Sequence, residues 1–264
     1  MKVFISADIE GSNGIADWSE SDKDAYFNKR MTMEVAAVCK GVNDFNANAE
    51  ILVKDAHGSG RNIDHELLPD NVLLNRAFSG HPLCMMNLLD SSFRASILTG
   101  YHSPAYAGGN PMAHTMTMKY RSVKINELVC SEFLISYYTS LYYGVPLVMV
   151  SGDKELCQIV KSTDTEILTV ETVCGLGASV TSVHPEKSRI QLRETAKAAL
   201  NNADRLRSTC TEKLPKSFAV EISFREHKKA FLASHYPNAV QTDAHTILYS
   251  CTDFMDVLRL MLFV

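Results

Sequence analysis

The sequence VFISADIEG at residues 3–11 begins with a short apolar run and ends with two carboxylates, Asp8 and Glu10. A short apolar run bounded by polar residues is typical of a buried strand. Similar runs follow at Ile51–Val53, Ser96–Gly100 and Pro146–Val150, and Ser217–Phe224 alternates as a half-buried strand does. They alternate with segments of helical spacing at Ala25–Ala49, Leu128–Tyr143, Asp153–Val160, Arg189–Arg207 and Asp253–Phe263. This alternation predicts an α/β fold with a mostly parallel sheet and flanking helices.

A change of pattern late in the chain predicts a domain boundary. The segment Glu171–Pro185 contains Gly175 and Gly177 and shows little periodicity. We therefore expect a metal-binding catalytic α/β domain over residues 1–185 and a smaller C-terminal α/β domain over residues 186–264.

The composition excludes several classes of protein. Hydrophobic residues make up 46% of the 264 residues and charged residues 21%, which excludes disordered, collagen-like and coiled-coil proteins. The formal net charge of −4 gives no basic excess for binding nucleic acid or an anionic membrane. The uncharged stretch Phe133–Val150 is long enough to span a membrane, but Gly144 and Pro146 interrupt it. We expect a helix, a turn and a strand there, and no membrane partner.

The cysteines and the start of the chain indicate a compartment. Seven cysteines occur without a CxxC pair, which argues against a zinc ribbon and a disulfide framework. The first residues lack the long apolar core of a signal peptide. We therefore expect a cytoplasmic protein.

Ionisable side chains follow three of the expected strands. Asp8 and Glu10 come after the first strand, His57 after the second and His102 after Ser96–Gly100. Parallel strands end at one edge of a sheet, where ligands commonly bind. Oxygen and nitrogen donors of this kind suit a divalent ion such as zinc. A histidine at a strand end is more often a surface or hydrogen-bonded residue, so position alone leaves the choice open.

Glu132 and His114 are two further candidates. Glu132 is the only charged residue between Leu128 and Gly152, so we expect its carboxylate to be buried beside a cation, and the alternative is a narrow solvent-facing stripe. His114 follows a glycine-rich loop, Ala107–Asn110, that could lie over a site. A histidine there could act as acid, base or carbonyl polariser, and the alternative is an ordinary turn histidine.

At these residues the chain resembles the M55 metallopeptidase family of DppA-type D-aminopeptidases. The resemblance covers residues 1–155 in order and continues more weakly to the C-terminus. The matching blocks are Ser6–Gly11, Lys54–His57, Gly100–His102, Ala113–Met116, Ile125–Asn126 with Glu132, and Val148–Asp153. Two positions depart from the family pattern: Ser131 replaces a common glycine, and Ala113 replaces a serine before His114.

The resemblance implies an activity, a cofactor and an assembly. It implies a zinc-dependent aminopeptidase that hydrolyses the N-terminal residue of short peptides, including D-amino-acid peptides, through a metal-activated water. It implies two zinc ions per subunit, with Asp8 bridging them and with Glu10, His57, His102 and Glu132 completing their shells. It implies His114 as the catalytic residue and a ring-shaped homo-oligomer, such as a decamer of two pentamers.

Two other functions compete with this interpretation. Another two-metal hydrolase, acting on phosphoesters or cyclic amides, would need a similar ligand set, and for a phosphate it would also need Lys or Arg at the site. Only Lys54 and Arg61 are close in sequence to a proposed ligand. The other alternative is a non-catalytic metal- or peptide-binding protein.

Overall fold

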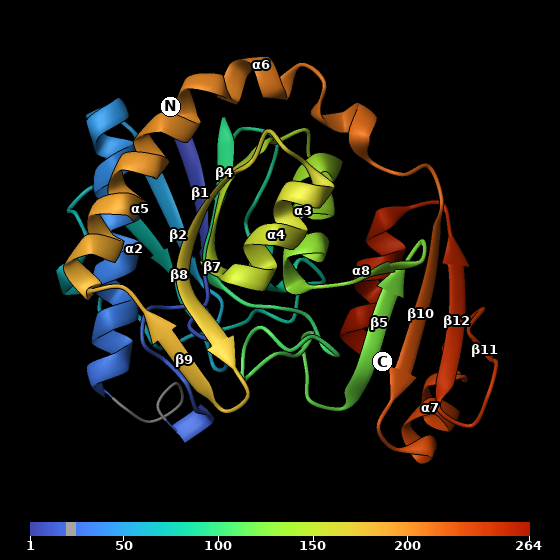
Figure 1. Ribbon diagram of the computed structural model, residues 1–264. Helices are drawn as coiled ribbons and strands as arrows, with labels where there is room; N and C mark the ends of the chain where they lie inside the picture. Colours follow the sequence, from blue (N-terminus) through green and yellow to red (C-terminus); the bar gives the residue numbers. More distant parts are fainter. Residues whose placement is uncertain (20–24) are drawn as a thin grey trace.

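Residues 1–19 and 25–264 are described by a computed structural model, which has two β-sheets (Figure 1). The first sheet has seven strands in the order β3-β2-β1-β4-β7-β8-β9. All neighbouring strands in it are parallel except β8 and β9, so the predicted mostly parallel sheet is confirmed. Its strands are β1 (Lys2–Ala7), β2 (Glu50–Asp55), β3 (Val72–Asn75), β4 (Ala95–Tyr101), β7 (Leu147–Asp153), β8 (Leu168–Leu176) and β9 (Ser179–Ser182).

Helices cover both faces of this sheet. On one face lie α2 (Ala25–Phe45) and α5 (Pro185–Ala199), and on the other lie α3 (Glu132–Tyr142) and α4 (Lys154–Thr163) (Figure 1). Because successive strand residues point to opposite faces, β1 contributes to two cores. Val3 and Ile5 pack in the core beneath α2 and α5, whereas Phe4 packs in the core that contains α3.

The second sheet is antiparallel and has five strands in the order β11-β12-β10-β5-β6. The C-terminal helix α8 (Phe254–Phe263) packs against both this sheet and α3. One hydrophobic core therefore continues from the second sheet through α8 and α3 to the first sheet. The remaining elements are β5 (Tyr120–Ile125), β6 (Leu128–Val129), β10 (Phe218–Phe224), β11 (Val240–Gln241), β12 (Thr246–Cys251), α6 (Ala203–Arg207) and α7 (His227–Ala233).

Residue 185 does not separate the two sheets. Strands β5 and β6 precede it and belong to the second sheet, while α5 follows it and packs on α2 beside the first sheet. The domain boundary near residue 185 stays a prediction. The segment Glu171–Pro185, which showed little pattern, contains most of the β8–β9 hairpin.

Three expected helices have different bounds in the structure. The helix expected from Leu128 begins only at Glu132, because Leu128 and Val129 form an edge strand and the Ser131 side chain caps the helix by accepting from the Leu134 N–H. The helix expected over Arg189–Arg207 starts at Pro185 and passes through a 3₁₀ turn at Leu200–Asn202 before α6. The helix expected to Ala49 ends at Phe45.

The uncharged stretch Phe133–Val150 is divided as the sequence predicted. Helix α3 ends at Tyr142, Gly144 adopts a left-handed conformation with φ +66°, and β7 begins at Leu147. Across residues 1–19 and 25–264, no helix combines the length and apolar character that crossing a bilayer requires.

Candidate metal centre

The five residues predicted as metal ligands converge at one edge of the first sheet. Strands β1, β2 and β4 are neighbours, and Asp8, His57 and His102 follow their carboxyl ends. Glu10 comes two residues after Asp8, and Glu132 is the first residue of α3. All five are buried, with exposed fractions of 4% or less. The burial of Glu132 excludes the solvent-facing alternative for that residue.

The two carboxylate oxygens of Asp8 face different histidines. Its Oδ1 lies 3.4 Å from His57 Nδ1, and its Oδ2 lies 3.7 Å from His102 Nε2. Glu10 Oε2 is 3.0 Å from the same nitrogen of His57, and Glu132 Oε2 is 3.5 Å from the same nitrogen of His102. These residues form two groups with ligand atoms close enough to hold an ion, and the groups share only Asp8: Asp8, Glu10 and His57, and Asp8, His102 and Glu132.

The donor atoms fit a zinc centre. Among the described residues, Glu10 Oε2 and His102 Nε2 are fully buried and lack a well-aligned hydrogen bond, although they lie 3.0 Å from His57 Nδ1 and 3.5 Å from Glu132 Oε2. Buried polar atoms without a well-aligned partner are costly. His102 Nδ1 lies 2.8 Å from Ser103 O, a carbonyl that can only accept, so Nδ1 carries the proton. Nε2 is therefore the ring nitrogen that faces the carboxylates and can bind an ion. Histidine ligands of metals are commonly oriented by such a hydrogen bond.

Burial and charge oppose each other at these side chains. Burial lowers the pKa of His57, but the facing carboxylates of Asp8 and Glu10 outweigh it and raise the pKa to about 11. The pKa of His102 is likewise held well above its ordinary value, chiefly by Glu132. Burial raises the pKa of Glu132, but His102 and His114 lower it below the ordinary value. A cluster of three buried carboxyl groups of this kind needs cations beside it.

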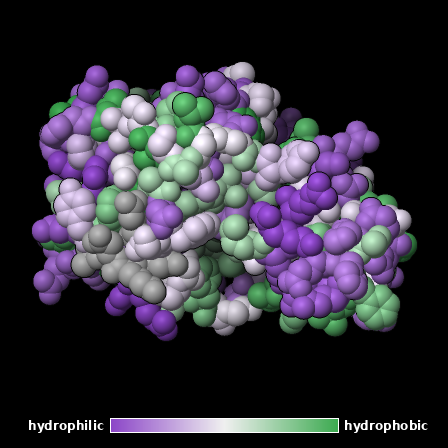
Figure 2. Space-filling model, turned by 60° about the horizontal axis from the view of Figure 1, so that its bottom comes forward, coloured by the Kyte–Doolittle hydropathy of each residue, from purple (hydrophilic) through white to green (hydrophobic). Residues whose placement is uncertain are grey.

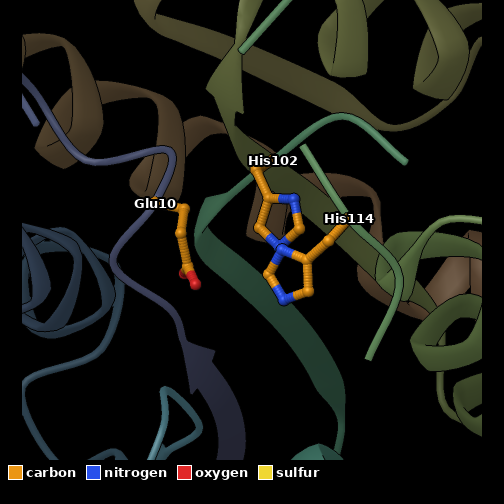
Figure 3. Close-up of side chains that lie close together, drawn as sticks. All are labelled: Glu10, His102 and His114. Atoms are coloured by element: carbon orange, nitrogen blue, oxygen red, sulfur yellow. The ribbon is translucent and has the colours of Figure 1, made fainter. Parts of the chain in front are cut away.

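His114 lies beside this centre, next to His102. Its ring stacks on that of His102, with 4.4 Å between the ring centroids and 9° between the planes, and the Glu10 carboxylate points toward the pair (Figure 3). His114 Nδ1 lies 3.0 Å from Met112 O, so Nε2 faces the site, 3.4 Å from Glu132 Oε1. Trp18 makes an edge contact with His114, with 5.1 Å between the ring centroids. Glu10, His102 and His114 also form a third group with metal-binding spacing.

Two loops behind the ligands are fixed by buried carboxylates. Asp55 accepts hydrogen bonds from the backbone N–H groups of Asn62 and Ile63 and from the Asn62 side chain, which also donates to His57 O. This arrangement fixes the loop that carries His57. Asp153 caps α4 by accepting from the Leu156 N–H.

Asp153 also connects His102, Glu10 and His114. It accepts from Ser103 N at 2.6 Å and from Ser103 Oγ, and Ser103 O in turn accepts from His102. It also accepts from Asn110 Nδ2, which donates to Glu10 O. Asn110 Oδ1 accepts from the N–H of Met112, the residue that holds His114. The glycine-rich loop expected to lie over the site therefore supports the site through buried Asn110. In the sequence, Asp153 begins an expected helix and ends the block Val148–Asp153 that resembles the M55 family, and neither feature indicates these contacts.

The centre opens into a cavity of about 770 Å³. Its walls are apolar and aromatic around the acidic and imidazole groups, and they include Trp18, Phe78, Met85, Met116 and Met118. Figure 2 shows the surface hollowed near the middle of this face, between a larger lobe and a smaller, mainly hydrophilic lobe. No Lys or Arg lines the cavity within residues 1–19 and 25–264. The other six histidines of the chain do not line it: His65, His81, His184, His227, His235 and His245.

Comparisons with known proteins agree with this geometry. A D-aminopeptidase of Bacillus subtilis (strain 168) is 28% identical to the chain over 268 residues, covering 99% of this chain and 96% of the relative. A solved structure described as a Zn-dependent D-aminopeptidase DppA from Bacillus subtilis, a self-compartmentalizing protease, superposes with a TM-score of 0.89 at 25% identity, covering 99% of this chain and 96% of that one. The chain matches the D-aminopeptidase family of M55 peptidases over residues 1–263. It therefore belongs to the M55 family of D-aminopeptidases.

Proposed function

We propose that the chain is a zinc-dependent aminopeptidase that holds two ions through Asp8. One ion would be held by Asp8, Glu10 and His57, and the other by Asp8, His102 and Glu132. The observation that carries this proposal is that two buried groups of candidate ligands share the carboxylate of Asp8. One oxygen of this carboxylate faces the first group and the other oxygen faces the second. When bound, two divalent ions lower the pKa of a water and polarise a scissile carbonyl.

The cavity walls favour a peptide substrate. A free α-amine is a cation, and the carboxylates of Glu10 and Glu132 border the cavity where it would lie. A requirement for that amine would direct hydrolysis to the N-terminal residue of short peptides. The B. subtilis relatives are D-aminopeptidases, which supports D-residues at that position.

His114 has the position of a proton-transfer group. Its Nδ1–H is fixed by Met112 O, so Nε2 is the atom that holds or gives up a proton toward the cavity. A group in this position can protonate the leaving amine or stabilise the developing negative charge on the carbonyl oxygen. The stacked His102 behind it and the edge of Trp18 fix the plane of its ring.

The phosphoesterase alternative finds no support in the cavity. Lys54, the basic residue nearest to a ligand in sequence, is buried, donates from Nζ to Ala77 O and lies over the Phe78 ring at 4.1 Å. Arg61 does not line the cavity. Transferred phosphoryl groups are usually held by Arg, Lys or metal ions, and no Lys or Arg of the described residues lines this cavity.

A homo-oligomeric ring in the cytoplasm completes the proposal. The solved relative is described as self-compartmentalizing, which supports an assembly that encloses its active sites. We expect light scattering to give a mass well above that of a dimer of the 29.3 kDa chain. A monomeric mass would contradict the ring while leaving the metal centre untested.

The decisive experiment combines metal content with a substrate panel. Metal-free protein is titrated with zinc while the fluorescence of Trp18, the single tryptophan, and hydrolysis of L- and D-dipeptides and a chromogenic phosphate ester are followed. We expect activity on dipeptides to appear with up to two zinc equivalents and to disappear on chelation. Full dipeptide activity in rigorously metal-free protein would refute the proposal, and phosphate-ester hydrolysis alone would support the alternative.

A further inference from the structure

A second, smaller cavity adjoins the metal centre. This cavity, which we call the annex, has a volume of about 110 Å³. No charged side chain of the described residues lines it. Its lining includes Leu83, Met86, Ile135, Leu258, Met261 and Leu262.

The annex and the main cavity share one wall, formed by Cys84, Met85 and Met116. The Met116 N–H donates to Glu132 Oε1 at 2.6 Å, so this wall touches a metal-ligand residue directly. Cys84 and Met116 have left-handed backbones, with φ of 47° and 61°. Such conformations are unfavourable for residues other than glycine and cluster at ligand-binding sites.

Helix α3 sets how far the annex lies from the metal centre. Glu132, Ile135 and Ser136 are separated by three and four positions, so they lie on one face of α3 within about one turn. Glu132 lines the main cavity, whereas Ile135 and Ser136 line the annex. Leu258, Met261 and Leu262 of α8 have the same spacing and form another part of its lining. The annex thus begins about one helical turn from the carboxylate of the site.

The size and chemistry of the annex define its ligand. A dry cavity of about 150 Å³ can hold a benzene molecule, so 110 Å³ is suited to an aliphatic or thioether side chain. Thioether walls adapt to ligand shape, and four methionines line the annex: Met85, Met86, Met116 and Met261. In an N-terminal residue, the side chain branches from the carbon between the α-amine and the scissile carbonyl. With the α-amine at Glu132, as proposed above, this side chain would lie within reach of the shared wall.

We propose that the annex is the subsite for the side chain of the substrate's N-terminal residue and that it selects side chains of the size of leucine and methionine. The inference rests on the proposed aminopeptidase activity and names its substrate class. Side chains that are charged would leave an unpaired charge among apolar walls, and alanine would leave the annex empty.

The test uses opposite changes at one residue. We compare kcat/KM for X-Ala amides, with X being Ala, Leu, Met, Phe or Lys in both stereochemical forms. The wild type is expected to favour Leu and Met over Ala by about 10-fold or more, the range of selectivity that apolar pockets give. Met261→Trp, which fills the annex, should reduce the Leu-to-Ala ratio by about 10-fold, while Met261→Ala should raise the Phe-to-Leu ratio.

Phe263→Ala is the matched control on the same helix, because Phe263 is exposed and does not line the annex. Its substrate ratios should equal those of the wild type. The assignment is overturned if Met261→Trp and Met261→Ala change the preference for larger over smaller N-terminal side chains in the same direction. It is also overturned if the variants change only the preference for the residue after the scissile bond, measured with an Ala-X series. Zinc content and unfolding curves of each variant identify general loss of structure.

A binding measurement separates this inference from the proposed function. Calorimetry compares isoamylamine with ethylamine on the zinc-loaded protein, since each carries an amine and only the first has a branched apolar chain. Tighter binding of isoamylamine that Met261→Trp removes would support the annex even if no peptide were hydrolysed. Hydrolysis of peptides with a flat side-chain profile in the wild type and both variants would refute the annex and leave the aminopeptidase intact.

Discussion

The rings of His102 and His114 stack at 4.4 Å between centroids, yet their Nε2 atoms have different surroundings. His102 Nε2 is fully buried between Asp8 Oδ2 and Glu132 Oε2. His114 borders the main cavity, and its Nε2 lies 3.4 Å from Glu132 Oε1. Each Nδ1 is hydrogen-bonded to a backbone carbonyl, so Nε2 is the free nitrogen position of both rings. The two Nε2 atoms therefore differ only in their surroundings. We expect His102 to hold metal and His114 to act on the substrate.

Substitution of His114 by alanine should therefore separate catalysis from metal binding. We expect both zinc ions to remain and the catalytic rate to fall on the order of 10²–10⁴-fold, as for the loss of an acid–base or oxyanion group. KM should change less, because the interaction strengthens in the transition state. Zinc stoichiometry and rate are measured on the same preparation. Loss of zinc would reassign His114 to the third ligand group, and an unchanged rate would leave it an ordinary turn histidine.

Glu132→Gln should remove metal and activity together. The glutamine keeps an oxygen that can accept from the Met116 N–H but lacks the charge that faces His102. We expect zinc affinity and rate to fall at least about 10-fold. Glu127→Gln is a suitable control, since Glu127 is exposed in the turn before β6. Unchanged zinc affinity in Glu132→Gln would show that the second ion does not depend on this carboxylate.

Much of this site follows from the sequence because of one property of parallel sheets. The sequence is sufficient to predict that Asp8, His57 and His102 lie close together, since strands β1, β2 and β4 end at the same edge. Glu132 could be identified because a single charge in an apolar helix requires a partner. The start of that helix could not be predicted, because Leu128 and Val129 are apolar in sequence yet form an exposed edge strand.

The contacts behind the ligands were beyond sequence reasoning. Asp153 bonds to Ser103 and Asn110, which lie 50 and 43 positions away along the chain. No local pattern encodes such a pairing. The position of Asp153 at the start of an expected helix is explained by its capping of α4 alone, so it gives no sign of the contacts with Ser103 and Asn110. For the same reason, the membership of β5 in the second sheet could not be predicted, since its partner β10 is distant in sequence.

Asp153→Asn should weaken the site without touching a ligand. The asparagine places an amide group against the donors of Ser103, Asn110 and Leu156, so the orientations of His102, Glu10 and His114 lose their common support. We expect a 10- to 100-fold loss in zinc affinity or kcat, as is usual for groups that orient metal ligands. Ser103→Ala, which keeps the backbone donor, should have a smaller effect.

Asp164→Asn is the control for stability in the Asp153 experiment. Asp164 accepts from Tyr137 and Lys213 near the surface and does not line the metal cavity. If Asp153→Asn and Asp164→Asn change zinc affinity equally, Asp153 has only a general structural role.

Glu34 should make the stability of the fold depend on pH. It is buried beneath α5, where Oε1 accepts from Ser188 Oγ at 2.9 Å, and burial raises its pKa to about 7 despite hydrogen bonds from Ser188 and Asn13. The folded state therefore holds this proton more tightly than the unfolded state. The contribution is fully present below about pH 4.5 and is lost as the pH rises through about 7, by roughly 3 kcal/mol in the free energy of unfolding.

Glu34→Gln should remove this dependence. The glutamine is neutral at every pH, and its amide can donate to Ser188 Oγ while its oxygen accepts from the Asn13 N–H. The difference in free energy of unfolding between variant and wild type, measured by urea denaturation from pH 4 to pH 9, cancels the contributions of the proposed metal-ligand residues. We expect this difference to move in favour of the variant between about pH 4.5 and 7 and then to level off. The same substitution at the exposed Glu212 is the control, and a pH-independent difference for Glu34→Gln would show that this carboxyl is not protonated in the fold.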